Sequence, residues 1–247
     1  MWPLYFLFNK IPKTDEEERA VSDGDRLRLV ELHHEEVLPR SYFVEVPHIN
    51  QLNSWDCGLA CVLMVLKSLG ITCNFEVLSE LCCTNSIWTV DLAYLLLRFP
   101  VSFSFFTVTV GANPNYSGET FYKCSSISGE EISVLILSGK YIAIALVDQY
   151  KLSQSWPENF SVPSLFASNS GYTGHYVVIC GYDTDADEFE IRDPASSRKH
   201  ERVSSKCLEE ARKCFGTDED LLLISLEKSE KQNNPSVLLH PDVNIHL

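Results

Sequence analysis

The stretch QLNSWDCGLAC, residues 51–61, opens a run of apolar residues that extends over 57–69. Because this run is apolar on nearly every side, it predicts a helix that is buried all round, and its lack of alternation argues against a strand. The stretch therefore predicts an interior helix that carries Cys57 on its first turn.

The ends of this helix, and the other helices, are predicted from capping signals. Ser54 or Asp56 is expected to cap the start, and Gly70 follows where a helix C-terminus favours glycine. The other expected helices are residues 90–99 with Thr89 as N-cap and Pro100 as stop, a helix opened by the capping pair Ser128 and Glu131, and residues 205–215 closed by Gly216.

Strands are expected mostly in the second half of the chain. A polar stretch, 149–174, is expected to be an insertion loop, and the two strands that follow it flank an acidic turn and predict a hairpin. Helices first and strands later predict an α+β domain. The expected strands are 42–46, 101–110, 141–148, 175–183, 188–193 and 220–226.

The composition predicts one globular domain with short ends. The 247 residues are 45% apolar, enough for an independent core. We expect a charged arm at 1–40 with a short helix near 27–37, a domain at 41–226, and a polar tail at 227–247.

Charge and cysteine usage exclude several classes of partner and site. A formal net charge of −14 opposes binding to a nucleic acid polymer, and no apolar run approaches the ~20 residues of a membrane-spanning helix. The odd number of cysteines, nine, and their places inside apolar runs favour a reduced cytoplasmic protein. Their spacing does not match a structural zinc site, so no metal site is predicted from them.

The start of the buried helix is the place where we expect chemistry. Unpaired N–H groups and the helix dipole stabilise a thiolate there, and they also offer donors to an oxyanion. Cys57 is therefore a candidate nucleophile. Gln51, six residues earlier, can place its amide N–H beside the Cys57 backbone N–H as a second oxyanion donor.

A thiol nucleophile also needs a base and a group that orients the base. His175 begins one strand of the predicted hairpin and Asp193 ends the other, so the two residues are expected within a couple of positions of each other across the strands. Asp193 can then hold the His175 imidazole in the tautomer that leaves one nitrogen free for Cys57.

Each of these residues also has an ordinary structural interpretation. Cys57 alone is typical of a buried helix, His175 of a strand end, Asp193 before a proline of a turn, and Gln51 of a loop. Their joint occurrence on one helix start and two paired strand ends favours the catalytic interpretation.

Three of these segments resemble a family of peptidases. QLNSWDCGLACVLMVL, GHYVVICGYD and IRDP are similar to the papain-like domain that removes double-glycine leaders from bacteriocins. The resemblance implies a papain-like cysteine peptidase fold, in which the helix with the nucleophile packs on an antiparallel sheet. It also implies catalytic roles for Gln51, Cys57, His175 and Asp193.

A longer resemblance is to the plant soluble guanylyl cyclase family. It rests on MWPLYFLFNK, SYFVEVPHINQLNSWDCGLACVLMVL, TNSIWTVDLAYLLLRF and EEARKCFGTDEDLLLISL, and covers nearly the whole chain. It implies conversion of GTP to cyclic GMP and pyrophosphate, with magnesium, in the cytoplasm of a plant.

The residues themselves favour other chemistry, so three functions stay open. No Walker-type phosphate loop is present, and the basic groups available to a triphosphate are Arg192, Arg198, Lys199 and Arg202. Guanylyl cyclase activity follows from the longer resemblance. A thiol-dependent peptidase or amide hydrolase follows from the residue chemistry, with no cofactor. The third function is a non-catalytic adaptor with the same fold.

Overall fold

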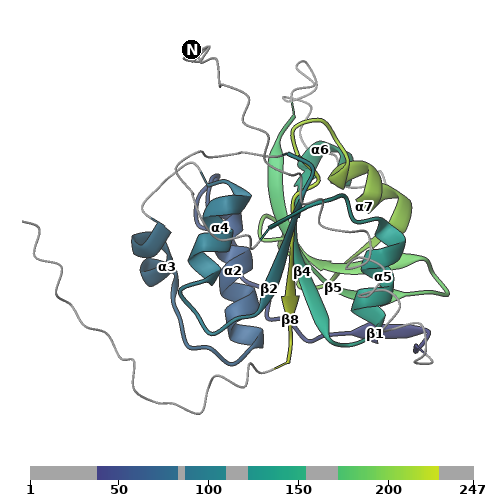
Figure 1. Ribbon diagram of the computed structural model, residues 1–247, viewed down its shortest axis with the longest axis horizontal. Coiled ribbons are helices and arrows are strands. Elements are labelled where there is room, and N and C mark those ends of the chain that lie inside the picture. The colour runs from purple at the N-terminus through teal and green to yellow at the C-terminus, as the bar shows by residue number, and fades with distance from the viewer. Residues whose placement is uncertain (1–37, 83–86, 110–121, 154–171, 228–247) are drawn as a thin grey trace, which may run out of the picture.

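The computed structural model describes residues 38–82, 87–109, 122–153 and 172–227, which form one sheet with helices on both faces (Figure 1). The strands run in the spatial order β3-β2-β8-β4-β5-β6-β7, and β1 pairs with the end of β5. The strands are β1 (Ser41–Phe43), β2 (Phe103–Thr107), β3 (Tyr122–Cys124), β4 (Tyr141–Asp148), β5 (Gly174–Asp183), β6 (Glu188–Arg192), β7 (Glu201–Ser204) and β8 (Leu221–Ser225). The helices are α2 (Cys57–Ser68), α3 (Phe75–Cys82), α4 (Thr89–Leu96), α5 (Gly129–Leu137), α6 (Gln149–Ser153) and α7 (Ser205–Arg212).

The sheet separates two apolar cores. Helices α2, α3 and α4 cover one face, and α5, α6 and α7 cover the other (Figure 1). Because both faces of the central strands are covered, β5 is buried from His175 to Tyr182 and its sequence does not alternate. The expected α+β architecture is confirmed: α2, the helix that carries Cys57, packs on a mainly antiparallel sheet. One edge pairing, β2 with β3, is parallel.

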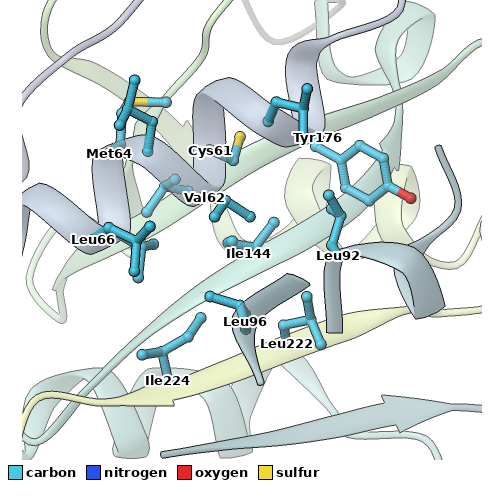
Figure 2. Close-up of a cluster of buried hydrophobic side chains, with 14 of the residues drawn as sticks. Cys61, Val62, Met64, Leu66, Leu92, Leu96, Ile144, Tyr176, Leu222 and Ile224 are labelled. Carbon is cyan, nitrogen blue, oxygen red and sulfur yellow. The ribbon is translucent and has the colours of Figure 1, made fainter. Parts of the chain in front are cut away.

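Helix α2 lies at the centre of the first core. Every residue from Cys57 to Leu66 is buried, which confirms the helix predicted from the apolar run. Figure 2 shows Val62 and Leu66 of this helix on the side that faces Ile144 of β4 and Leu222 of β8. These side chains fill the space between the helix and the sheet. Gly70 ends the helix with φ of 74°, as expected for a glycine at this place.

The N-cap predictions have different outcomes. Asp56 is the N-cap residue of α2 but makes no side-chain capping hydrogen bond. Trp88, not Thr89, is the N-cap of α4, because the Thr89 hydroxyl lies within the core. The capping box of α5 forms as predicted: the N–H of Glu131 donates to Ser128 Oγ at 3.2 Å, and the N–H of Ser128 donates to Glu131 Oε2 at 2.8 Å.

Several expectations concern residues outside the described ranges. The predicted helix near 27–37 lies there, as do most of the arm at 1–40 and of the tail at 227–247. The expected insertion, 149–174, begins with α6, and its residues 154–171 also lie outside. No helix in the described part of the chain is long and apolar enough to cross a membrane.

Candidate active site

The first turn of α2 carries Cys57, one of the free thiols of the chain. The residue is buried, with 6% of its surface exposed. Because no side chain caps α2, the first N–H groups of the helix remain available to a negative charge. These groups and the helix dipole are the features that favour a thiolate at this place.

His175 and Asp193 meet at the open end of the β5–β6 hairpin. The Nε2–H of His175 donates to Asp193 Oδ1 at 2.7 Å, and both side chains are buried. Val178 pairs with Arg192, so Asp193 stands two positions away from the residue opposite His175. The expected cross-strand relation of the two residues is therefore present.

The third member of the cluster is the Cys57 thiol, which is hydrogen-bonded to His175. Burial lowers the pKa of the imidazole, but the hydrogen bond and charge of Asp193 and the hydrogen bond to Cys57 raise it to about 9. Since Nε2 is bonded to Asp193, Nδ1 is the nitrogen that faces the sulfur. At neutral pH the imidazole is thus a cation placed beside the Cys57 sulfur.

The loop before α2 is fixed to the residues that follow Asp193. The N–H of Gln51 donates to the carbonyl of Pro194 at 3.0 Å, and His48 Nε2 donates to the carbonyl of Asp193 at 2.9 Å. The side-chain amide of Gln51 donates one N–H to the carbonyl of Asn53 at 2.8 Å. Its Oε1 is buried without a hydrogen-bond partner among the described residues.

A second polar cluster is centred on Thr89, at the start of α4. The Thr89 and Tyr176 hydroxyls are 3.0 Å apart, and Thr89 is also hydrogen-bonded to Asp220. Burial raises the pKa of Asp220 to about 6 despite its bonds to Thr89 and Thr107. The cluster joins α4 to the sheet, and sequence analysis missed it because its members come from four distant segments.

The basic residues expected to contact a triphosphate have other contacts. Arg192 is 1% exposed; its Nη1 donates to Glu190 Oε1 at 2.7 Å and its Nε donates to the carbonyl of Val46 at 2.9 Å. Arg192 is therefore held inside the protein by acceptors of the chain itself, and its contact with a nucleotide stays a prediction.

The other three members of this basic group lie nearer the surface. Arg202 forms ion pairs with Asp183 and Glu188, Arg198 pairs with Glu201, and Lys199 is exposed. The acidic partners reduce the positive potential that a triphosphate would meet. These contacts give no support to a phosphate site here.

Magnesium is the cofactor that the longer resemblance implies. Within the described ranges, no group of three or more His, Cys, Asp or Glu side chains is placed to hold a metal ion. Magnesium usually takes only one or two protein carboxylates and completes its shell with water and substrate phosphates, so its binding stays a prediction.

The comparisons with known proteins identify the family. The family model described as guanylylate cyclase matches residues 46–126 and 123–224. Guanylyl cyclase 1 of Arabidopsis thaliana is 55% identical to this chain over 272 residues, which cover 94% of the chain and 99% of that protein. The chain belongs to this guanylyl cyclase family. The resemblance expected from the sequence is thereby confirmed, and the name of the relative implies an enzyme.

Solved structures similar to this guanylyl cyclase family member include peptidases. A putative C39-like peptidase from Bacillus anthracis has a TM-score of 0.49 and 17% identity, covering 77% of this chain and 97% of its own. A double glycine motif protease in complex with its leader peptide has a TM-score of 0.44 and 14% identity, covering 74% and 93%. At these scores the similarity has no bearing on the chemistry of the site.

Proposed function

We propose that this guanylyl cyclase family member is a thiol-dependent hydrolase of peptide or amide bonds. The observation that carries the proposal is the buried cluster of Cys57, His175 and Asp193, with one imidazole nitrogen on the carboxylate and the other facing the sulfur. Nucleophile, proton carrier and orienting group are the parts that acyl transfer by a cysteine requires.

In this reaction the Cys57 sulfur attacks the carbonyl carbon of the substrate. A carbon–sulfur bond forms while the carbonyl oxygen takes the negative charge, which the N–H of Cys57 and the free N–H of Gln51 stabilise. His175 donates its proton to the leaving amine as the carbon–nitrogen bond breaks. Water, deprotonated by His175, then hydrolyses the thioester and restores the thiol.

The second candidate function is conversion of GTP to cyclic GMP and pyrophosphate. The 55% identity to Guanylyl cyclase 1 over nearly both chains supports it. The ribose 3′-oxygen would bond to the α-phosphorus as the bond to pyrophosphate breaks, and a base must take the 3′ proton. His175 is the nearest candidate base, but its pKa of about 9 leaves it protonated at neutral pH, which weakens this assignment.

One set of assays on the purified full chain separates the two functions. The first assay measures alkylation of Cys57 by iodoacetamide, with the modified residue identified by mass spectrometry. The second measures cyclic GMP formed from GTP and magnesium. The variants are Cys57→Ala and His175→Ala, with Cys73→Ala as a control because this free cysteine is half-buried and lies outside the site.

Selective labelling of Cys57 that depends on His175, without cyclic GMP, supports the hydrolase. Cyclic GMP formation that survives Cys57→Ala contradicts the hydrolase and supports the cyclase. If neither activity is found, both proposals are wrong and a non-catalytic adaptor is favoured.

A further inference from the structure

The carboxylate of Asp56 is fully buried directly before the nucleophile, and it accepts hydrogen bonds from the preceding loop. Its Oδ1 accepts from the N–H of Leu52 at 3.1 Å and from the N–H of Asn53 at 3.0 Å. Its Oδ2 accepts from the same Asn53 N–H at 3.0 Å and from Asn53 Nδ2 at 2.8 Å. These donors offset the desolvation of the buried charge.

The direction of this carboxylate has a consequence for α2. An aspartate at an N-cap normally accepts from the first turn of its own helix, whereas Asp56 makes no such bond. The first intrahelical hydrogen bond runs from the N–H of Ala60 to the carbonyl of Asp56 at 3.0 Å. The N–H groups before Ala60, including that of Cys57, are therefore left for a ligand instead of a cap.

The same carboxylate controls the residues that hold Gln51. Asn53 is gripped by Asp56 through both its backbone and side-chain nitrogens, and the carbonyl of Asn53 accepts the Gln51 amide at 2.8 Å. The other side of Gln51 is anchored by its N–H on Pro194, next to Asp193. The orientation of the Gln51 amide thus depends on Asp56 on one side and, on the other, on the Pro194 carbonyl just after β6.

We propose that Asp56 is a positioning residue, which orients the Gln51 amide and keeps the α2 N–H groups free for the oxyanion. The inference rests on the proposed hydrolase function. Asp56 acts through Gln51 and does not touch the substrate.

The test compares two reactions of the same sulfur in wild type and in Asp56→Asn. Alkylation by iodoacetamide needs the thiolate but develops no oxyanion. A short peptide aldehyde ending in glycinal adds the sulfur to its carbonyl carbon, and its oxygen becomes an oxyanion in the site. The small glycine end suits a nucleophile that is only 6% exposed.

We expect Asp56→Asn to weaken binding of the aldehyde about 100-fold, the scale of losing one oxyanion donor. The NH2 group that replaces Oδ2 cannot accept from the Asn53 side-chain amide, so the loop that holds Gln51 loses this bond. The rate of alkylation stays within about threefold of wild type, since His175 and the helix are untouched. The matched control is Asp185→Asn, at an exposed aspartate, which should change neither the binding of the aldehyde nor the rate of alkylation. An equal loss in both reactions would overturn the proposal.

A double-mutant cycle tests whether Asp56 acts through Gln51. In a Gln51→Ala background the further loss caused by Asp56→Asn should fall to less than about threefold, because the group being oriented is gone. An undiminished loss in that background contradicts the proposal.

Amide hydrogen exchange tests the positioning itself, even if the chain proves to have no hydrolase activity. Asp56→Asn should speed exchange at Leu52 and Asn53 at least about tenfold, while the amides of α5 remain as protected as in wild type. Unchanged exchange at Leu52 and Asn53 refutes the positioning role, whatever the activity of the wild type.

Discussion

His175 and Asp193 are joined by a 2.7 Å hydrogen bond between two buried side chains, although 18 positions separate them in the sequence. The bond stands at the open end of the β5–β6 hairpin, where the register sets their separation. Because burial alone lowers the pKa of this imidazole, its charge at neutral pH depends on the carboxylate and the thiol beside it.

The first prediction concerns the pH dependence of stability. The folded pKa of His175, about 9, lies above its ordinary value of 6.5, so the folded state holds the proton more tightly. The stabilisation is fully present below pH 6.5 and is lost as the pH rises from 6.5 to 9.

Asp193→Asn should flatten this decline, because the charge that raises the pKa is gone. Urea unfolding at pH 6, 7, 8 and 9 measures the free energies. Equal slopes for wild type and Asp193→Asn between pH 7 and 9 would contradict the assignment.

The second prediction concerns Gly58, which follows Cys57 in α2. A Cβ at this position would lie 2.9 Å from a Leu92 methyl and 3.2 Å from the Tyr176 ring. Gly58→Ala should therefore lower the free energy of unfolding by about 1–3 kcal/mol, although alanine favours helices. It should also slow alkylation of Cys57.

Gly129→Ala in the first turn of α5 is the matched control. Its Cβ would meet only the flexible Glu209 side chain, at 3.3 Å, so the change in stability should stay within about 0.5 kcal/mol. A similar effect of the two substitutions in thermal or urea unfolding counts against tight packing at Gly58.

The third prediction separates a structural role of Arg192 from a role in nucleotide binding. Removing this buried guanidinium leaves Glu190 and the Val46 carbonyl short of donors, so Arg192→Ala should destabilise the fold by about 3–5 kcal/mol. Arg40→Ala removes an exposed pair with Asp185 and should cost less than about 1 kcal/mol. Loss of GTP binding by Arg192→Ala, with an unchanged free energy of unfolding, would instead support a contact between Arg192 and the triphosphate.

The fourth prediction concerns the buried carboxyl of Asp220. Its folded pKa of about 6 lies above its ordinary value of 3.8, so stability falls as the pH rises from about 4 to 6 and the penalty persists above that. Asp220→Asn should raise the free energy of unfolding at pH 7.5 by up to about 3 kcal/mol, since one pKa unit is worth about 1.4 kcal/mol.

The gain from Asp220→Asn should vanish at pH 4, where the wild-type carboxyl is protonated. Asp185→Asn on the surface is the control and should show no such dependence. A gain of equal size at both pH values would mean that charge is not its cause.

The sequence predicts this fold well where one kind of pattern dominates. The apolar run of α2 and the hairpin of β5 and β6 are local features, and together they place Cys57, His175 and Asp193 on three element ends. Helix α3 was missed although Phe75, Leu78 and Cys82 form an apolar stripe at helical spacing that packs on the first core.

The errors arise where tertiary contacts override local preference. Aspartate often caps a helix with its side chain, yet the Asp56 carboxylate accepts hydrogen bonds from the N–H groups of Leu52 and Asn53 in the preceding loop. Arg192 stands next to a basic run that is typical of a solvated loop, but it is the last residue of β6, which lies between β5 and β7, and it is buried against Glu190. Spacing along the chain indicates which residues are near each other, and it does not tell which donor a side chain will choose.

Among the strands that the structure describes, β8 is the last in sequence, and it lies between β2 and β4 in the middle of the sheet. During synthesis β2 and β4 therefore cannot pair with β8 until residues 221–225 have left the ribosome. Until then each of these two strands has an unpaired edge that can associate with other chains. A message truncated before these codons would encode Cys57, His175 and Asp193 in full and still yield a product that aggregates instead of folding.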